Sequence, residues 1–328
     1  MPKVSVVIPT YNRANLITKT IESVLAQTFR DFEIIVIDDG STDNTMEIVS
    51  TFPVKYVKQQ NQGPGAARNK GIELSTGEYV AFLDSDDVFF KDTLAKNVAI
   101  LDSHPKVGIS YGQAYATDEK GNILDIEPIS KKSCIRQGWE ELGNYLRTGY
   151  HVTMSTVLVR RSCLEEVGGF KAAFRSGSED LDLWIRLAKK CEVAYIAEPL
   201  AKWGPLSRGF SSKRSLRDWE NANSSIIESI CNDAELSTRL SHLRPIAYFR
   251  LYSNMARRAC RRKNMKTARE YLFRAVKVHF GSLFGRLGWF WIICFIRTWI
   301  PLPIIAIASS VKHYLIRTIR YKFKSNLK

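Results

Sequence analysis

The sequence predicts an α/β protein in which helices flank a mostly parallel sheet, with a C-terminal helical extension. Three observations support this fold class. Roughly the first hundred residues alternate short apolar runs with segments of helical periodicity. Polar clusters directly follow the apolar runs, and the chain beyond about residue 218 carries helical patterns throughout. Alternating strands and helices are typical of a parallel sheet covered on both faces.

Four short runs rich in β-branched or apolar residues predict buried strands at 4–9, 32–38, 54–57 and 79–84. Between and after them, apolar stripes, N-cap candidates and a small-residue run predict helices over 15–27, 43–51, 63–74 and 93–101. This order places successive strands in one sheet, with their carboxyl ends at a common edge.

The middle of the chain is less regular. VGISYGQAYATD and STVLVRR indicate strands, and GSEDLDLWIRLAKK indicates a helix that begins with acidic residues. Residues 246–278 predict two amphipathic helices joined near Lys263 and Asn264. We therefore predict a three-part organisation: an α/β domain over 1–217, a helical extension over 218–282 and a basic hydrophobic tail over 283–328.

The cysteines and the N-terminus indicate the compartment. None of the six cysteines forms a C-x-x-C pair, so neither a zinc site nor a redox motif is suggested. Isolated cysteines fit a reducing compartment. The N-terminus, MPKVSVVIPTYN, has no long apolar run and no small-residue cleavage site, which predicts a mature N-terminus without a signal peptide.

Charge is distributed unevenly along the chain. Residues 231–328 carry 20 Lys and Arg against 3 Asp and Glu, a net charge of +17, whereas residues 1–230 carry 28 against 30. The basic character therefore belongs to the C-terminal part alone. Such asymmetry suggests a polyanionic partner, either a membrane surface or nucleic acid.

Polar clusters follow three of the predicted strands: PTYNR after the first, DDGS after the second and DSDD after the fourth. Ligands of open α/β sheets bind outside the carboxyl ends of the strands, so these clusters predict one shared site. Asp, Gly, Ser and Asn are also ordinary turn residues, which leaves a purely structural reading of each cluster open.

Three ordered blocks resemble the family 2 glycosyltransferases. They are VSVVIPTYNRANLITKTIESVLAQTF with FEIIVIDDGSTDNT, then NQGPGAARNKGIELSTGEYVAFLDSDD, and later VGGFKAAFRSGSEDLDLWIRLAK. The resemblance covers residues 3–100 continuously and implies the GT-A fold, a Rossmann-like nucleotide-sugar-binding domain. It also implies transfer of a sugar from a nucleoside diphosphate donor to an acceptor, with inversion at the anomeric carbon.

On the nucleoside side, the resemblance implies that Pro9, Thr10 and Tyr11 line the nucleoside pocket. Asp39, in IDDGS, would hydrogen-bond the base, which is usually uracil in this family. UDP is therefore the expected nucleotide.

Toward the diphosphate, the resemblance implies that Arg68 lies by the nucleotide and that Asp84 contacts the ribose. Asp86 would hold the divalent metal ion, Mn²⁺ or Mg²⁺. The chemistry fits, because these ions prefer oxygen ligands and are often bound by one or two carboxylates together with substrate phosphates. Such an ion stabilises the charge of the leaving diphosphate. Asp87 is interpreted as a cap or a supporting residue.

On the acceptor side, the resemblance places Glu179 and Asp180, in SED, at the family's acceptor-side acids, and Asp180 is the candidate general base. Direct displacement needs a base on the face opposite the leaving group, and a carboxylate is a suitable type. Acids at a helix start also cap free N–H groups, so both roles stay open. Trp184 is expected in the core or near the acceptor.

One departure concerns the loop that folds over the diphosphate in many relatives, where an Arg and a His are common. No histidine occurs between His151 and His242, so a metal-binding histidine from that loop is not expected. Arg208 or Lys202 is a candidate replacement as a diphosphate contact. His151, just before a predicted strand, is either structural or part of the acceptor side.

The tail contains twenty mostly apolar residues, 289–308, long enough to span a bilayer. Arg297 near its middle, Pro301 and Pro303, and basic residues on both flanks favour a re-entrant or in-plane segment instead.

The last stretch, VKHYLIRTIRYKF, places apolar residues on one helical face among Lys and Arg, which is typical of a helix lying on an anionic membrane. A buried helix covering the domain is the alternative. The aromatics of the tail are not interleaved with its basic residues, so no nucleic acid partner is expected.

Together these features predict a metal-dependent, inverting glycosyltransferase at the cytoplasmic face of a membrane. Its donor is a nucleotide-sugar and its acceptor a saccharide or lipid-linked saccharide used in surface glycan synthesis. The alternative is a non-catalytic nucleotide-sugar-binding or scaffold protein of the same fold.

Overall fold

The computed structural model describes residues 1–118, 122–123, 132–149, 152–171, 179–204 and 215–284. The chain divides into two compact units, Met1–Arg214 and Ser215–Lys328. Each unit is described by itself.

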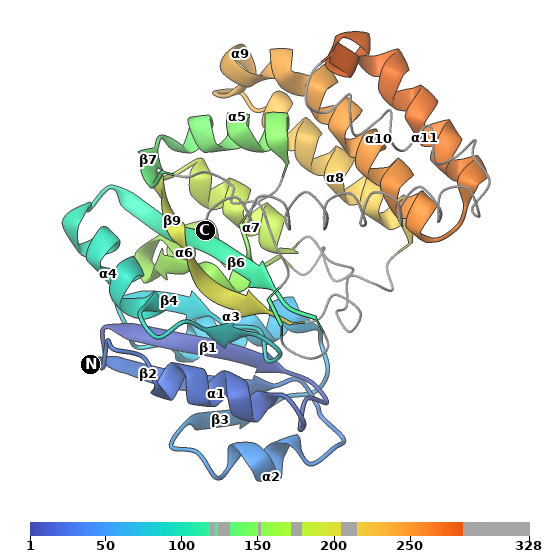
Figure 1. Ribbon diagram of the computed structural model, residues 1–328. Helices are drawn as coiled ribbons and strands as arrows, with labels where there is room; N and C mark the ends of the chain where they lie inside the picture. Colours follow the sequence, from blue (N-terminus) through green and yellow to red (C-terminus); the bar gives the residue numbers. More distant parts are fainter. Residues whose placement is uncertain (119–121, 124–131, 150–151, 172–178, 205–214, 285–328) are drawn as a thin grey trace, which may run out of the picture. The chain divides into compact units, whose positions relative to one another are not determined.

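The first unit is built on a nine-stranded sheet in the order β3-β2-β1-β4-β8-β6-β9-β5, with β7 also paired to β9 (Figure 1). Its parallel half consists of β1 (Val4–Thr10), β2 (Phe32–Asp38), β3 (Lys55–Lys58) and β4 (Tyr79–Phe82). The other half consists of β5 (Val88–Phe89), β6 (Val107–Ala116), β7 (Cys134–Arg136), β8 (Leu158–Arg160) and β9 (Glu192–Trp203). In that half, β6 and β9 are parallel, and the other pairings are antiparallel.

The helices of this unit are α1 (Ile17–Leu25), α2 (Thr45–Val49), α3 (Pro64–Leu74), α4 (Thr93–Ser103), α5 (Gly138–Thr148), α6 (Arg161–Val167) and α7 (Glu179–Ala188). The predicted α/β class and mostly parallel sheet flanked by helices are confirmed (Figure 1). All eight strands and helices predicted in the first hundred residues are present, with small shifts at their ends.

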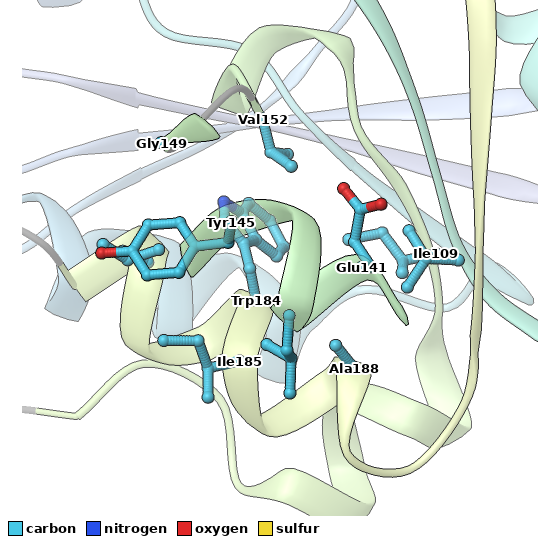
Figure 2. A pocket seen from close by; sticks show the side chains of 11 residues that line it. Ile109, Glu141, Tyr145, Gly149, Val152, Trp184, Ile185 and Ala188 are labelled. Carbon is cyan, nitrogen blue, oxygen red and sulfur yellow. The ribbon is translucent and has the colours of Figure 1, made fainter. Parts of the chain in front are cut away.

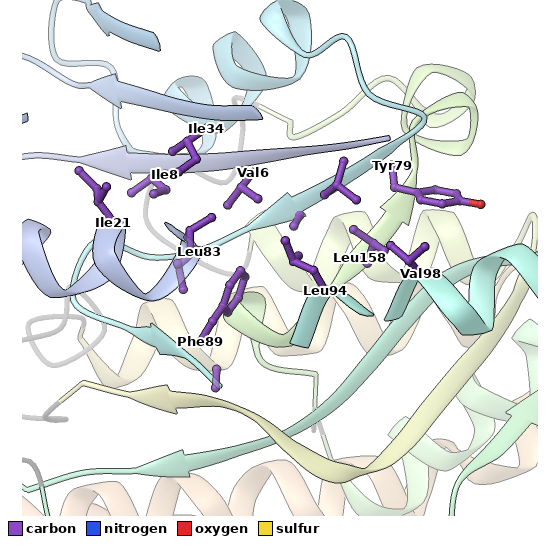
Figure 3. Close-up of a cluster of buried hydrophobic side chains, with 14 of the residues drawn as sticks. Val6, Ile8, Ile21, Ile34, Tyr79, Leu83, Phe89, Leu94, Val98 and Leu158 are labelled. Atoms are coloured by element: carbon purple, nitrogen blue, oxygen red, sulfur yellow. The ribbon is translucent and has the colours of Figure 1, made fainter. Parts of the chain in front are cut away.

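The main core lies between the sheet and the helices α1 and α4 (Figure 3). Alternate residues of β1, including Val6 and Ile8, point into this cluster because successive strand residues face opposite sides. Leu83 and Phe89 join it from either side of the DSDD turn. The acidic turn is thus anchored at both ends by fully or almost fully buried apolar side chains.

Helix α3 covers the other face of the sheet at very close range. A β-carbon placed on Gly71 would lie 2.2 Å from Cγ1 of Val7, which only glycine avoids. Ala67 of the same helix packs with Ile35 and Ile37 of β2. The small residues of GAARNKG therefore let α3 approach the sheet closely, which positions Arg68 of this helix near the carboxyl edge.

One prediction in the middle of the chain is corrected, and one strand was missed. STVLVRR is not one strand: a 3₁₀ turn occupies Met154–Thr156, β8 begins at Leu158, and α6 begins at Arg161. The longest of the described strands, β9, was not predicted. It contains Pro199, which cannot donate to the ladder, and the register to β6 shifts around Gln113.

The second unit is helical in its described part. It contains α8 (Leu216–Cys231), α9 (Ser237–Leu240), α10 (Arg244–Arg261) and α11 (Met265–Val278). The predicted helix pair is confirmed: Lys263 turns the chain with φ of 59°, and the Asn264 side chain caps α11 by accepting from the backbone N–H of Thr267.

No helix in the described part of the chain combines the length and hydropathy needed to cross a membrane. Residues 289–308 and the basic stretch after them lie outside the described residues, so the predictions about the tail stay predictions.

Candidate active site

Three parallel strands deliver polar residues to one edge of the sheet, as the sequence predicts. Thr10 ends β1, Asp38 ends β2, and Asp84 lies two residues beyond the end of β4. The backbone N–H of Asp39 donates to the Thr10 carbonyl at 2.8 Å, which joins the first two loops. Asn12, with φ of 52°, strengthens this joint because its side-chain oxygen accepts from the Thr42 N–H at 2.8 Å.

Asp39 organises the entry to α3. Its buried carboxylate accepts from the Gln59 side chain at 2.8 Å, from the Gln62 N–H at 2.9 Å and from the Gly63 N–H at 2.7 Å. Three hydrogen bonds fix the segment that precedes Pro64, the first residue of the helix. The residue expected to recognise the base therefore also holds the loop beside it.

Of the three residues expected to line the nucleoside pocket, Pro9 and Thr10 are buried, and Tyr11 is 47% exposed. The hydroxyl oxygen of Thr10 has no hydrogen-bond partner among the described residues, although it is buried. An orphaned buried hydroxyl is uncommon, because leaving one unsatisfied costs about 1–3 kcal/mol. A bound polar ligand is one group that would satisfy it.

Arg68 joins the acidic turn after β4 to the first turn of α7. Its guanidinium donates to Asp84 Oδ1 at 2.7 Å and to Glu179 Oε1 at 3.0 Å. Only 5% of Arg68 is exposed, and the ring centre of Phe170 lies 5.6 Å from its guanidinium carbon. Burial alone would lower the pKa of Arg68, but the two carboxylates raise it, so the side chain stays charged.

The charged form of Asp86 is disfavoured by its surroundings. Burial, followed by the charge of Asp84, raises its pKa, and the nearby Arg13 opposes this rise. The Arg13 guanidinium lies 3.5 Å from the Asp86 carboxylate. The two acids are thus close enough to repel each other, and a cation already faces one of them. This arrangement suits a further positive charge at Asp86.

The buried carboxylate of Asp87 holds the acidic turn through hydrogen bonds, in line with the supporting role predicted for it. It is 1% exposed, and its carboxylate accepts from the Ser155 hydroxyl at 2.5 Å and from the Gly204 N–H at 2.8 Å. Ser155 in turn accepts from the backbone N–H of Asp84 at 3.1 Å. The DSDD turn is therefore held by residues from two distant segments of the chain.

Glu179 and Asp180 form the first turn of α7, where the helix dipole favours acidic side chains. The Asp180 carboxylate accepts from the N–H of the next residue, Leu181, at 2.7 Å, within the first turn of the helix. Glu179 is held by Arg68 and is 13% exposed in its side chain. Stabilisation of the helix start and proximity to Arg68 therefore coexist at these two acids.

The VGGF segment places α7 against α3. The Asn69 side chain donates to the Phe170 carbonyl at 2.7 Å and accepts from the Phe170 N–H at 2.8 Å. Arg186 of α7 donates to the carbonyls of Val167 and Gly169, both at 2.6 Å. These bonds fix the position of Phe170 beside Arg68.

Helices α5 and α7, together with β6 and β9, line a small and mostly apolar cavity of about 40 Å³ (Figure 2). Trp184 and Ile185 line it from α7, and Leu142 and Tyr145 line it from α5. Trp184 is 5% exposed, so its place is in the core, one of the two locations predicted for it.

Several supporting residues were missed from the sequence. Arg13, Ser155 and Gly204 contact the acidic turn, but Ser155 and Gly204 lie far from it in the chain and carry no motif of their own. Lys202 lies on β9 with its amine 5.7 Å from the ring centre of Phe90. His151 and Arg208 lie outside the described residues, so their predicted roles stay predictions.

Known proteins resemble this chain in sequence. A model of the Glycosyl transferase family 2 domain matches residues 5–168. The amylovoran biosynthesis glycosyltransferase AmsB of Erwinia amylovora is 32% identical over 65% of this chain and 75% of its own length. An uncharacterized glycosyltransferase of Rickettsia conorii is 35% identical over 72% of this chain and 38% of its own length. The chain spans about a third of the length of the first curated relatives it matches.

Solved structures share the fold at low identity. TarS 1–349 of S. aureus in complex with UDP-GlcNAc is 22% identical, with a TM-score of 0.61 over 90% of this chain and 81% of its own. The mannosyltransferase PcManGT of Pyrobaculum calidifontis, in complex with GDP-Man and Mn²⁺, is 21% identical, with a TM-score of 0.57 over 90% of this chain and 87% of its own. The fold is therefore GT-A, and the chain belongs to glycosyl transferase family 2.

Proposed function

We propose that this chain transfers a sugar from a UDP-sugar donor to a hydroxyl of a saccharide or lipid-linked saccharide, with inversion at the anomeric carbon. The observation that carries the proposal is the pair of contacts from Arg68 to Asp84 and Glu179. Through these contacts, the Arg68 side chain bridges a residue expected to bind the donor and an acid expected to serve the acceptor. Inversion requires a base and a leaving group on opposite faces of one sugar, so residues of both kinds must lie near a common site.

On the donor side, we propose that Pro9, Thr10 and Tyr11 line the nucleoside pocket and that Asp39 recognises the base. The unsatisfied Thr10 hydroxyl supports this role, because it is a buried polar atom at the expected place. Solved relatives of the same fold bind UDP-GlcNAc in one case and GDP-Man in another, and UDP is the nucleotide we propose here.

Closer to the reaction, we propose that Arg68 orients Asp84, which contacts the ribose. Arg68 keeps its charge in the folded protein, so it also attracts the anionic donor.

The residues present fit a divalent metal ion, Mn²⁺ or Mg²⁺, at Asp86. Asp86 offers hard oxygen ligands, and a cation there would relieve its repulsion with Asp84. No group of three or more His, Cys, Asp or Glu side chains that could hold a metal is found in the described parts of the chain, so donor phosphates would complete the coordination. When bound, the ion would act as a Lewis acid that stabilises charge on the diphosphate.

In the proposed reaction, Asp180 accepts the proton of the acceptor hydroxyl as its oxygen attacks the anomeric carbon. The bond from that carbon to the diphosphate oxygen breaks, and its electron pair leaves with the diphosphate. Glu179, held by Arg68, fixes the start of α7 and so keeps Asp180 in place.

The cellular setting is proposed from the tail and from a relative. AmsB takes part in amylovoran biosynthesis, which supports a role in surface polysaccharide synthesis. The charge of residues 231–328 supports a polyanionic partner. The aromatics of the tail are not interleaved with its basic residues, which favours the anionic cytoplasmic surface of a membrane over nucleic acid.

A donor screen by thermal shift tests the proposal. A nucleotide-sugar that binds the folded chain raises the midpoint of unfolding, and a UDP-sugar together with Mn²⁺ is expected to give the largest rise. The same pairs are then assayed for donor hydrolysis and transfer. Binding without turnover by any donor would instead favour a nucleotide-sugar-binding protein that lacks catalysis.

A further inference from the structure

Two cysteines share one small space beneath the sheet edge opposite the site. Cys163 lies on α6, and Cys191 lies directly before β9. A β-carbon placed on Gly108 of β6 would lie 2.3 Å from the sulfur of Cys191 and 2.9 Å from that of Cys163. The two sulfurs therefore flank the position that a side chain at 108 would fill.

Glycine at position 108 is unfavourable for strand stability, and the room that it leaves for the two thiols explains its presence. Glycine weakens a strand interior, and here the register between β6 and β9 shifts beside it. In return, the missing side chain leaves room for two thiols to face each other. Both cysteines are free and partly exposed, so small oxidants can reach them.

The thiols also differ in reactivity. The interaction with the Cys191 thiol, together with the charge of Arg160 and against the effect of burial, lowers the pKa of the Cys163 thiol to about 7. The pKa of the Cys191 thiol is raised, first by its interaction with the Cys163 thiol and then by burial. At neutral pH one sulfur is ready to attack and its neighbour is a protonated thiol, the usual arrangement of a reactive and a resolving cysteine.

We propose that Cys163 and Cys191 form an oxidation site, which takes a peroxide and closes to a disulfide. The Cys163 thiolate attacks a peroxide oxygen, the O–O bond breaks, and hydroxide leaves, which gives a sulfenic acid. The sulfur of Cys191 then attacks the sulfenic sulfur, an S–S bond forms, and water leaves with the proton of Cys191. Hydrogen peroxide is reduced by two electrons to water, and the two thiols supply those electrons.

The disulfide would close a covalent ring that contains the residues proposed for the acceptor side of the site. The chain between the two cysteines contains the VGGF segment and all of α7, with Glu179 and Asp180. Closing this segment into a ring restricts the unfolded chain and stabilises the folded one. The oxidised protein is therefore expected to unfold at a temperature several degrees higher, and dithiothreitol is expected to reverse the change.

The full chain is reduced, freed of reductant and treated with hydrogen peroxide, and its peptides are analysed by mass spectrometry. A linkage between 163 and 191 is expected as the main disulfide, and Cys134→Ser is expected to leave it unchanged. In Cys191→Ser the sulfenic acid has no resolving partner, so a dimedone adduct at Cys163 is expected in at least about tenfold excess over Cys134, whose pKa is raised. Absence of the linkage, or equal labelling of the two cysteines, would overturn the proposal.

Gly108→Ala tests the geometry with both cysteines present. The added methyl group would collide with both sulfurs, so the linkage is expected to be lost or strongly reduced. Linkage at the wild-type rate in a folded Gly108→Ala variant would contradict the shared-space argument. If this variant does not fold, the labelling of Cys191→Ser decides by itself.

Discussion

Arg68 and Glu179 are 111 positions apart in the chain, yet the guanidinium donates to the carboxylate at 3.0 Å. The same guanidinium donates to Asp84 at 2.7 Å. Close packing of α3 on the sheet at Gly71 brings Arg68 to the carboxyl edge, and the Asn69 bonds to Phe170 bring the chain before α7 beside it. One buried side chain therefore links the two halves of the proposed site.

Arg68→Ala is expected to destabilise the first unit by about 3 kcal/mol, because removing one partner of a buried ion pair leaves the other charges uncompensated. Donor affinity should fall as well. Lys70→Ala on the same helix is the matched control, since its pair with Glu73 is exposed and should be worth less than about 1 kcal/mol. Chemical denaturation measures both variants, and equal stability of the two would contradict the linking role.

Asp86→Ala is expected to abolish transfer and the Mn²⁺-dependent part of the donor-induced thermal shift, while the fold persists. Loss of a desolvated carboxylate whose pKa is raised should not cost stability. Asp31→Asn, an exposed acid before β2, is the control and should keep the full response to Mn²⁺. A normal metal response in Asp86→Ala would remove that residue from metal binding.

Asp87 makes stability depend on pH. Burial and then the charge of Asp84 raise its pKa well above the ordinary value of 3.8, so the folded state binds a proton that the unfolded state releases. Its contribution to the free energy of unfolding therefore falls as pH rises from about 4 through the raised pKa.

Asp87→Asn removes this titration, and its amide can still accept from the Gly204 N–H. The free energy of unfolding of the wild type minus that of the variant should decrease with rising pH over that window. Denaturation at several pH values measures this difference, and a constant value would show that Asp87 does not titrate as argued.

The tail is expected to hold the protein at membranes. Deletion of 283–328 removes the long apolar run and much of the C-terminal positive charge, so the shortened chain should move from the membrane fraction to the supernatant on centrifugation. Donor-induced thermal shifts serve as the control for an intact first unit. Continued sedimentation of the shortened chain with membranes would contradict this role of the tail.

Local patterns were enough to predict the parallel half of the sheet, because there each strand and helix is a contiguous run with its own period. They also placed Thr10, Asp39 and Asp84 at one edge, since parallel strands end together. They did not reveal β9, whose Pro199 interrupts the strand pattern.

The contacts that hold the acidic turn could not be predicted from the sequence either. Ser155 and Gly204 reach Asp87 only through tertiary packing, and neither residue type signals such a contact. The hydrogen bonds of Asp39 are a similar case, because all three go to a segment about twenty residues away. The residues of the site could be predicted by type and order, whereas their mutual restraints depend on the folded chain.

The most direct test of the account is the turnover of Asp180→Asn with the donor that the thermal-shift screen identifies. The amide cannot accept the proton of the acceptor hydroxyl, so transfer should fall by roughly 10²–10⁴-fold while the donor-induced thermal shift stays unchanged. Asp182→Asn, on the same helix but paired with Arg186, should keep turnover close to that of the wild type. Near-normal transfer by Asp180→Asn would contradict its role as the general base and the mechanism built on it.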